Sequence, residues 1–267
     1  TERGFYLRDG GYYFAISDKM DLRLTGEIFT KGSWGLGASS TYALRYRFSG
    51  SFDFSYLVTK NGEKGLPDYA VGKNFRLQWS HRQDPKVRPN SNFSASVNFA
   101  TASYERSNLS SLYNPVLNSQ SMRTSSVSYS HTFPNIGLTL STTMNIAQNM
   151  QDSTLSLTLP NLSVSLSKKY PFKRKKRAGD ERWYEKISLS YSGQMSNSIS
   201  TKEDKVFKSN LVKDWRNGFK HNIPVSATFQ LFGFLNITPS FNYTERWYFK
   251  KINQEWDYAT NSVAKDT

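Results

Sequence analysis

Residues 33–48 read SWGLGASSTYALRYRF, and this stretch decides the fold class. Its even positions, from Trp34 to Phe48, are apolar in seven of eight cases, whereas the odd positions hold one apolar residue, Ala43. Side chains of a β-strand point alternately to opposite faces, so this period of two predicts a strand with one apolar and one polar face. The strand is also long. Strands of soluble proteins usually have about five or six residues, whereas a tilted strand that crosses a bilayer needs about 9–11.

The same alternation recurs along the chain. From Ile136 to Ile146 one face is largely apolar, while the other holds only glycine, threonine, serine and asparagine. Turn-forming residues separate several runs, at Phe48–Ser51, Pro134-Asn135, Pro160-Asn161 and Gly233. Because strands joined by tight turns are antiparallel, the sequence predicts an all-β antiparallel meander, with a short helix possible only at 205–216. About thirteen strands are predicted, at 11–17, 20–30, 33–48, 51–59, 69–81, 92–104, 124–133, 136–148, 153–159, 161–168, 185–200, 219–231 and 235–249.

Charge is distributed unevenly. The 44 residues 124–167 contain one charged residue, Asp152, whereas the next 19, residues 168–186, contain twelve. A soluble sheet normally carries Lys, Glu and Arg on its solvent face, but the polar faces here consist of Ser, Thr, Asn and Gly. Such faces suit a water-filled lumen, and the apolar faces suit lipid. Because a sheet in hydrocarbon must close to satisfy its backbone, the strands are predicted to form part of a transmembrane β-barrel.

The composition excludes membrane helices but not a barrel. The chain has 267 residues, a net charge of +14 and a mean hydropathy of −0.62, and no run approaches the roughly 18 apolar residues of a membrane helix. The mean hydropathy hides the apolar faces, because apolar and polar residues alternate along each strand and their values cancel. Aromatics make up 15% of the chain and recur near predicted strand ends, where they are either an interfacial girdle or packing residues. Residues 1–10 lack the apolar core of a signal peptide.

The sequence predicts no enzyme. Paired acids, Asp180-Glu181 and Glu203-Asp204, lie in loops rich in Lys and Arg, where solvated ion pairs are the simpler interpretation. No nucleophile elbow, phosphate loop, dinucleotide fingerprint or zinc spacing occurs, and there is no cysteine. His81, His131 and His221 are widely separated, which favours polar strand or loop residues over metal ligands. No catalytic residue, cofactor or metal is therefore expected.

Four stretches resemble one known family. They are GGYYFAISDKMDLRLTGEIFTKGSWGLGASSTYALRY, FRLQWSHRQDP, FSASVNFATASYER and LPNLSVSLSKKYPF, which begin at Gly10, Phe75, Phe93 and Leu159. In this order they resemble the LptD family of outer-membrane lipopolysaccharide (LPS) assembly proteins, also called the organic solvent tolerance family. The wording is most similar to Bacteroides-type members, and the resemblance runs from Arg3 to about Trp256.

The resemblance implies a function and a set of partners. In that family a periplasmic jellyroll passes LPS to a very large outer-membrane barrel, which releases it sideways between the first and last strands. By this resemblance residues 1–10 would end the periplasmic N-terminal region, and residues 11–267 would form about half of the barrel, with the C-terminal half absent. The implied location is the outer membrane of a Gram-negative cell. The implied partners are LPS, a lipoprotein plug in the barrel lumen, a periplasmic LPS bridge protein and outer-membrane lipid, with no nucleic acid.

The resemblance also implies a lateral gate in the first strands. In the family, prolines weaken hydrogen bonding there, whereas this sequence has Gly10, Gly11 and Gly26 at the corresponding places, beside Tyr12 and Tyr13. Glycine weakens a strand through backbone entropy and lost packing but keeps its N–H donor. The glycines are therefore candidate gate residues. The alternative is that they are ordinary bulges at a curved barrel edge.

A basic run provides the second candidate site. Residues 168–177, KKYPFKRKKR, contain seven cations in ten positions: Lys168, Lys169, Lys173, Arg174, Lys175, Lys176 and Arg177. These side chains could bind the phosphates of LPS, bind nucleic acid, or simply be solvated. The absence of a stacking platform disfavours nucleic acid. If Gly11 enters from the periplasm, thirteen strands place 105–123 and 169–184 on the periplasmic side, and 82–91 and 201–218 outside.

Three functions remain open at this point. The first is an LPS-assembling translocon, and the second is a passive porin or other outer-membrane barrel transporter, which would share the alternating faces. The third, a soluble basic β-protein that binds nucleic acid, requires the barrel prediction to be wrong.

Overall fold

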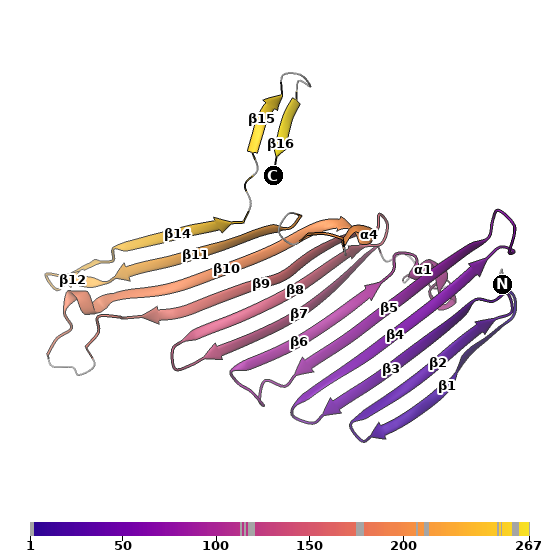
Figure 1. Cartoon of the computed structure of the whole chain (residues 1–267). Helices are drawn as coiled ribbons and strands as arrows, with labels where there is room; N and C mark the ends of the chain where they lie inside the picture. Colours follow the sequence, from indigo (N-terminus) through magenta and orange to yellow (C-terminus); the bar gives the residue numbers. More distant parts are fainter. Residues whose placement is uncertain are drawn as a thin grey trace. The chain divides into compact units, whose positions relative to one another are not determined.

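The computed structural model describes residues 3–112, 114, 116, 121–174, 179–206, 208–210, 214–249, 251, 253–257 and 262–266. Its elements follow one another along the chain as labelled in Figure 1. They are β1 (Tyr6–Ser17), β2 (Met20–Phe29), β3 (Trp34–Leu44), β4 (Phe48–Asn61), β5 (Ala70–Gln83), β6 (Ser91–Ala100), α1 (Tyr104–Ser107), α2 (Leu109–Leu112), β7 (Met122–Phe133), β8 (Leu138–Asn149), β9 (Thr154–Lys169), the 3₁₀ turn η1 (Trp183–Lys186), β10 (Ile187–Lys202), α4 (Glu203–Val206), β11 (Arg216–Ala227), β12 (Phe229–Leu231), β13 (Leu235–Ile237), β14 (Ser240–Tyr248), β15 (Asn253–Asp257) and β16 (Ser262–Asp266).

Twelve of these strands form one antiparallel sheet in chain order, from β1 through β11 to β14. This confirms the predicted all-β meander, and the sheet is open, as part of a barrel would be. Within the described residues β1 pairs with β2 alone. Two further hairpins, β12–β13 and β15–β16, stand outside the sheet. Among the described residues, no helix has the length and hydrophobicity to span a membrane.

The predicted turn at Phe48–Ser51 is wrong. β3 ends at Leu44 and β4 begins at Phe48. The turn between them is closed by a hydrogen bond from the Arg47 amide to the Leu44 carbonyl, at 2.9 Å, with Tyr46 at a φ of 60°. Gly50 lies inside β4 instead, opposite Tyr42. The turns expected at Pro134-Asn135 and Gly233 are confirmed, between β7 and β8 and between β12 and β13.

The predicted turn at Pro160-Asn161 is also wrong, because residues 154–169 form the single strand β9. The apolar alternation changes phase here, from odd positions before Pro160 to even positions from Leu162 onward. One irregular residue in a continuous strand produces such a change without reversing the chain. The sheet therefore has twelve strands rather than about thirteen. Connections 84–90 and 170–186 follow odd-numbered strands and 101–121 and 203–215 follow even-numbered ones, which overturns the predicted grouping of these loops by side.

Two compact units divide the chain, and the first comprises Thr1–Tyr129, Met144–Leu157 and Ser200–Val206. Cross-strand register within it sorts side chains into rows, because paired residues point to the same face. One row across β1–β6 is entirely apolar: Tyr12, Leu24, Ala38, Phe54, Leu77 and Phe99. The adjacent row is polar apart from Tyr13, whose hydroxyl is bonded to Asp21: Tyr13, Arg23, Ser39, Asp53, Gln78 and Asn98. The predicted two-faced strands thus align into a two-faced sheet.

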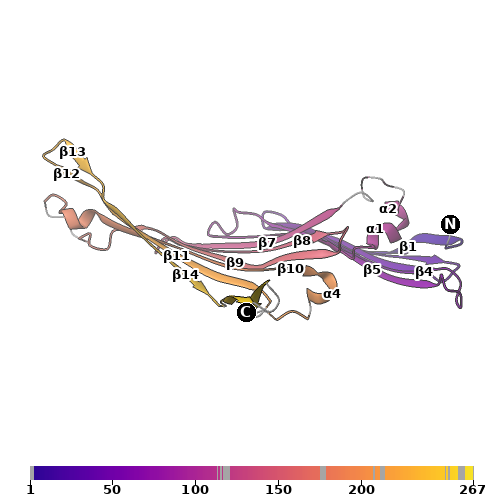
Figure 2. The same cartoon turned by 90° about the horizontal axis from the view of Figure 1, so that it is seen from above.

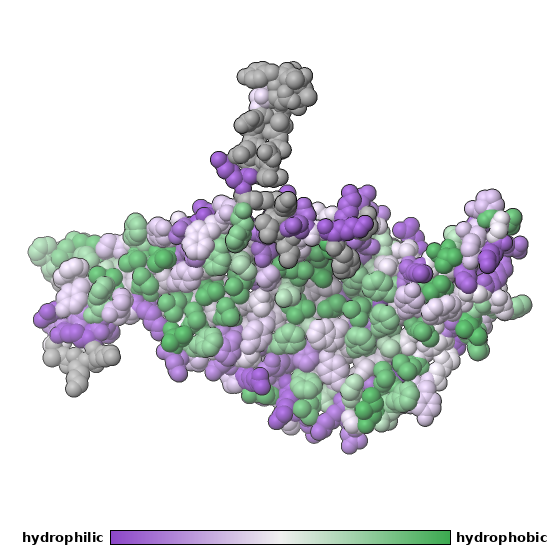
Figure 3. Space-filling view, in the orientation of Figure 1, coloured by the Kyte–Doolittle hydropathy of each residue, from purple (hydrophilic) through white to green (hydrophobic). Residues whose placement is uncertain are grey.

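The second unit comprises Ser130–Thr143, Thr158–Ile199 and Phe207–Thr267. Its strands β10, β11 and β14 alternate in the same way. Met195, Phe219 and Trp247 form an apolar row, and Gln194, Lys220 and Arg246 form the polar row beside it. Figure 3 shows hydrophobic side chains exposed over much of the viewed face, with hydrophilic ones among them.

Short helices lie on the polar face of the first unit. β6 ends at Ala100, four residues before the predicted end at 104, and α1 and α2 follow on one face of the sheet (Figure 2). Neither helix is predictable from the sequence, since helices of four residues leave no periodic pattern. Of the helix expected within 205–216, α4 (203–206) overlaps the first residues, and 207 and 211–213 lie outside the described residues.

Candidate functional site

The first two strands are joined by an interrupted ladder. Gly10 and Gly26 are direct cross-strand partners, and the register shifts between Leu7 and Gly10 and again between Phe14 and Ser17. Asp9, inside the first irregularity, has a φ of 57°, in the left-handed region that most residues avoid. Each irregularity costs ladder hydrogen bonds. β1 is therefore attached to its one neighbour less regularly than β3 is to β4, whose register is continuous.

The three glycines of these strands differ in whether packing requires a glycine at that position. A Cβ at Gly11 would overlap the backbone carbonyl oxygen of Leu24, so close approach of the two strands requires glycine there. A Cβ at Gly10 would meet nothing within 4 Å, and one at Gly26 would meet its nearest atoms only at 3.8 Å. Packing thus explains Gly11 but leaves Gly10 and Gly26 unexplained.

Tyr12 and Tyr13 point to opposite faces. The Tyr12 ring lies on the apolar face, 4.7 Å from the ring of Phe14. The Tyr13 hydroxyl donates to the Asp21 carboxylate at 3.3 Å on the polar face. Asp21 also accepts hydrogen bonds from the backbone N–H and the hydroxyl of Thr41, at 2.6 and 2.9 Å. Tyr13 therefore connects β1 to β2 and β3 from the polar side, whereas the Tyr12 side chain is exposed on the apolar face.

A cavity of about 380 Å³ opens on the polar face beside the first strands. Its walls come from β1–β5 on one side and from Tyr104, Asn108 and Ser111 on the other. The charged groups that line it are Arg8, Asp9, Arg23, Glu27, Asp53 and Arg76. This mixture of cations, carboxylates and hydroxyls can form hydrogen bonds with a saccharide and can neutralise an anionic group. Sequence analysis did not find it, because its residues are scattered over five strands.

The three arginines of this cavity are held in different ways. Arg8 forms an ion pair with Glu27 across β1 and β2, at 3.2 Å. The Arg23 guanidinium donates to the Ser39 hydroxyl at 3.3 Å. The guanidinium of Arg76 lies over the ring of Tyr104, 5.3 Å from its centroid, which ties α1 to the sheet.

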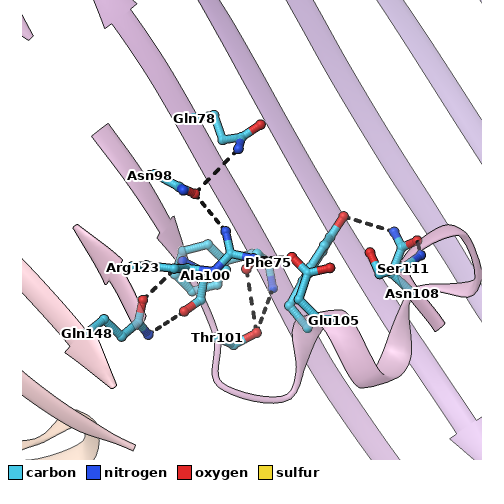
Figure 4. A network of polar contacts seen from close by, with 11 residues as sticks. Phe75, Gln78, Asn98, Ala100, Thr101, Glu105, Asn108, Ser111, Arg123 and Gln148 are labelled. Carbon is cyan, nitrogen blue, oxygen red and sulfur yellow. Dashed lines mark hydrogen bonds and ion pairs between the residues drawn. The ribbon is translucent and has the colours of Figure 1, made fainter. Parts of the chain in front are cut away.

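A buried polar network fixes α1 against the sheet (Figure 4). Glu105 of α1 pairs with Arg123 of β7, and their side chains are only 6% and 2% exposed. Arg123 also donates to the Asn98 side chain at 2.6 Å, and Gln78 donates to the same oxygen at 3.4 Å. Tyr104 is buried against Ala100 and Met150. The helical segment is therefore a fixed part of the polar face.

The network continues at the base of α1. The Gln148 side chain bonds to the backbone of Ala100 and to the carboxylate of Glu203, at the start of α4. The paired acid Glu203-Asp204 noted in the sequence thus contributes a structural contact through Glu203.

The basic run of residues 168–177 is partly described. Lys168 and Lys169 end β9, and Lys175, Lys176 and Arg177 lie outside the described residues. Lys173 pairs with Glu181 at 3.1 Å. Arg174 forks onto the Glu185 carboxylate with Nε at 2.6 Å and Nη2 at 3.0 Å. Two of the cations therefore have acidic partners within the loop, and the role of the run in phosphate binding stays a prediction.

The Glu185 carboxylate is the best-satisfied acid in this loop. It also accepts the backbone N–H of Arg182 at 2.7 Å and of Arg174 at 3.1 Å. Hydrogen bonding from the Arg174 side chain, followed by that from the Arg182 amide, lowers the pKa of Glu185 to about 2. The same pair raises the pKa of Arg174. The ionised form of Glu185 thus holds the loop around η1 together.

The histidines lie in aromatic clusters on the strands. His81 Nδ1 is 2.9 Å from the Tyr42 hydroxyl, and His221 Nδ1 is 2.9 Å from the Tyr191 hydroxyl. The His131 ring packs 4.4 Å from Phe133. No group of three or more potential metal ligands gathers within the described part of the chain.

Comparison with protein-family models matches the whole chain, residues 1–267, to the family described as LptD protein. A search of curated proteins finds no match.

Proposed function

The chain belongs to the LptD family, whose members are non-enzymatic transport proteins of LPS assembly, and from this premise we propose that it forms part of an outer-membrane translocon that inserts LPS through a lateral gate. The observation that carries the proposal is the pair of adjacent rows on β1–β6, one entirely apolar and one polar. A wall of this kind separates lipid from a wet lumen. The polar face accommodates the saccharide of LPS, while its acyl chains remain in the bilayer.

The gate in this proposal is β1. Two register shifts interrupt its ladder with β2, and the glycine pair Gly10 and Gly26 adds backbone entropy without packing. The cavity lined by Arg8, Arg23 and Arg76 lies beside the same strands on the polar face. A saccharide in that cavity is adjacent to the strand that must separate for the lipid to leave sideways.

The proposed partners follow from the two ends of this route. LPS enters from a periplasmic bridge protein, and a lipoprotein plug occupies the lumen against the polar face. The proposed contacts for LPS phosphates are the cations Lys168, Lys169 and Lys173 to Arg177. To bind a phosphate, Lys173 and Arg174 would have to leave their ion pairs with Glu181 and Glu185.

Depletion of the full-length protein tests this function against its main rival. An LPS assembler predicts that new LPS is retained inside the cell while small-solute uptake is unchanged. A passive porin predicts slower uptake with normal surface LPS. Release of the protein into buffer without detergent would contradict both membrane functions and favour the soluble nucleic-acid binder.

A substitution at the glycine pair tests the gate itself. A Cβ at Gly10 or Gly26 meets no atom closer than 3.8 Å, and Gly10→Val with Gly26→Val is expected to stabilise the β1–β2 hairpin by about 1–2 kcal/mol. We expect several-fold slower delivery of LPS to the cell surface at an unchanged amount of folded protein. Gly218→Val in β11, where a Cβ meets the Tyr248 ring at an ordinary 3.6 Å, is the matched control. Normal delivery in the double variant would remove these glycines from the gate.

A further inference from the structure

Two turns at one end of the strands are joined into a single surface. The turn of residues 45–47 connects β3 to β4, and the turn of residues 84–90 connects β5 to β6. The Asp84 amide donates to the Arg47 carbonyl at 2.7 Å, which fixes one turn against the other. A cavity of about 410 Å³ opens between them, and Arg45, Arg47 and Arg82 all line it.

The arginines of this cavity lack acidic partners. In the described part of the chain no ion pair includes Arg45, Arg47 or Arg82. Asp84 is the one carboxylate among the lining residues, and its Oδ1 accepts the backbone N–H of Lys86 at 2.9 Å. Three arginines therefore line one cavity without an acidic partner, and Arg45 lies over the ring of Tyr46, 5.9 Å from its centroid. Such forks suit phosphate oxygens, which they bind in pairs of hydrogen bonds.

The charge excess belongs to this end of the strands only. Residues 45–47 and 82–88 contain five cations and one acid: Arg45, Arg47, Arg82, Lys86, Arg88 and Asp84. The connections at the opposite ends of β2–β5, residues 30–33 and 60–69, contain three cations and two acids: Lys31, Lys60, Lys64, Glu63 and Asp68. If the excess of cations only reflected the basic composition of the chain, it would be similar at both ends of the strands.

Aromatic residues mark the level just below the arginines. The Tyr42 hydroxyl accepts a hydrogen bond from Trp79 Nε1 at 2.9 Å and bonds to His81. Phe48 and Phe93 pack on the His81 ring at 5.6 and 5.3 Å. Rings with polar tips prefer the boundary between hydrocarbon and headgroups. Arg82 directly follows His81 in β5, and Arg45 and Arg47 lie in the turn beyond Leu44, so the three arginines are then near the depth of headgroup phosphates.

A second cavity, of about 590 Å³, adjoins the first and shares Arg82 and Ser49 with it. Its other polar lining includes Ser80, Asn92 and Ser94. Hydroxyl and amide groups beside guanidinium groups match a ligand that joins sugar hydroxyls to a phosphate.

We propose that Arg45, Arg47 and Arg82 form a rim site that binds the phosphate groups of a phosphorylated glycolipid in the leaflet facing this end of the barrel. The site rests on the proposed function insofar as that function places the strands in a bilayer. It uses no residue of the gate strand β1 or of the basic run of residues 168–177. Its effect is to hold the phosphate groups of that lipid at the ends of β3–β5, where Arg82 reaches them from the polar face of the sheet.

Lipid binding to the full-length protein in phosphatidylcholine nanodiscs tests the site. The probes are diphosphoryl lipid A, its dephosphorylated form and inorganic phosphate, and the retained lipid is counted by native mass spectrometry. The variant is Arg45→Gln/Arg47→Gln/Arg82→Gln, and the control is Lys31→Gln/Lys60→Gln/Lys64→Gln at the opposite strand ends. All six side chains lie at turns or strand ends, and heat-modifiable migration on gels checks that each variant is folded.

The expected result is at least about a tenfold loss of bound diphosphoryl lipid A in the arginine variant, since the variant lacks the charge-assisted hydrogen bonds to phosphate oxygens. The lysine control keeps the lipid, and dephosphorylated lipid A binds the unsubstituted protein as weakly as it binds the arginine variant. Arg→Lys at the three positions restores binding in part, because charge returns without the planar fork.

Three results would overturn the rim site: equal retention by the arginine variant, equal loss in the lysine control, or inorganic phosphate binding as tightly as the lipid. Failure of the rim site leaves the proposed function intact if the arginine variant is integral to the membrane and still delivers LPS. Failure of the proposed function is seen separately, as extraction without detergent or as normal surface LPS after depletion.

Discussion

The ring of Tyr42 lies over the backbone of Gly50, its direct cross-strand partner on β4. A Cβ at residue 50 would overlap the tyrosine ring. The ring therefore occupies the space that a side chain at residue 50 would need. From there the Tyr42 hydroxyl bonds to Trp79 and His81 on β5. One tyrosine therefore connects three strands, and an aromatic ring covers a glycine that would otherwise weaken the sheet.

Replacing Gly50 with alanine should destabilise the protein. The added methyl group would overlap both the Tyr42 ring and the backbone carbonyl oxygen of Ser80, and such overpacking typically costs about 1–3 kcal/mol. Urea unfolding in detergent, followed by tryptophan fluorescence, measures the change. Gly218→Ala, where the new Cβ makes only ordinary contacts, should be neutral or stabilising. Equal stability of the two variants would show that Tyr42 does not depend on the space over Gly50.

Removing one member of the buried ion pair should release α1 from the sheet. Glu105→Ala leaves the Arg123 charge buried without its partner, and such a loss costs about 3–5 kcal/mol. Replacing both residues, with Glu105→Leu and Arg123→Met, should recover most of that stability because no buried charge remains. Urea unfolding and protease cleavage within residues 101–112 measure both effects. Additive losses in the double variant would rule out a direct coupling of the two charges.

Gly11→Ala should disturb the gate strand more than Gly10→Ala does. The first substitution places a Cβ on the Leu24 carbonyl and separates β1 from β2 locally, whereas the second enters open space. In the full-length protein, Gly11→Ala is expected to admit bulky antibiotics that the outer membrane normally excludes, and Gly10→Ala is not. The minimum inhibitory concentration of a large glycopeptide antibiotic measures the difference. Identical values would mean that the β1–β2 contact at Gly11 does not control leakage.

The loop around η1 should loosen in acid through Glu185. Its pKa is about 2 in the folded loop against an ordinary value of 4.5, so folding favours the ionised carboxylate. The stabilisation is complete above about pH 4.5 and is lost as the pH falls toward 2. Fluorescence of Trp183 in variants that lack the other tryptophans follows the loop over this range. Glu185→Gln should loosen the loop at neutral pH and remove the acid transition, and an unchanged transition in that variant would assign it to another group.

Much of this architecture is predictable from residue order, because a period of two leaves a long trace in every strand. The faces of β3 and β5 could be assigned from alternation, since their apolar residues keep one phase from end to end. The turn at Pro160 could not be excluded, because a change of phase inside a continuous strand resembles a break between two strands. In the sequence Gly50 resembles a turn residue. In the structure glycine is required there because the ring of Tyr42, 8 positions away in sequence, lies opposite it in the sheet.

The site was predictable only where its residues are contiguous. Gly10 and Gly26 could be singled out from sequence, and the structure makes them cross-strand partners. The cavity beside them could not, since Arg8, Arg23 and Arg76 meet only through the register of five strands. The rim arginines were likewise hidden, because Arg45, Arg47 and Arg82 belong to two different turns. The run of residues 168–177 is prominent in the sequence because of its density of charge. Two of its cations, however, are paired with acids that follow it in the chain.

The most direct test of the central claim compares two neighbouring residues of β5. Leu77 lies in the apolar row and Gln78 in the polar row, and the 267 residues contain no cysteine. A nitroxide spin label is attached to Leu77→Cys or Gln78→Cys in the full-length protein in lipid vesicles, and its collisions with oxygen and with a water-soluble nickel complex are measured. The label at 77 is expected to collide mainly with oxygen, which concentrates in lipid, and the label at 78 mainly with the nickel complex. Equal access of the nickel complex to both labels would contradict a wall between lipid and lumen.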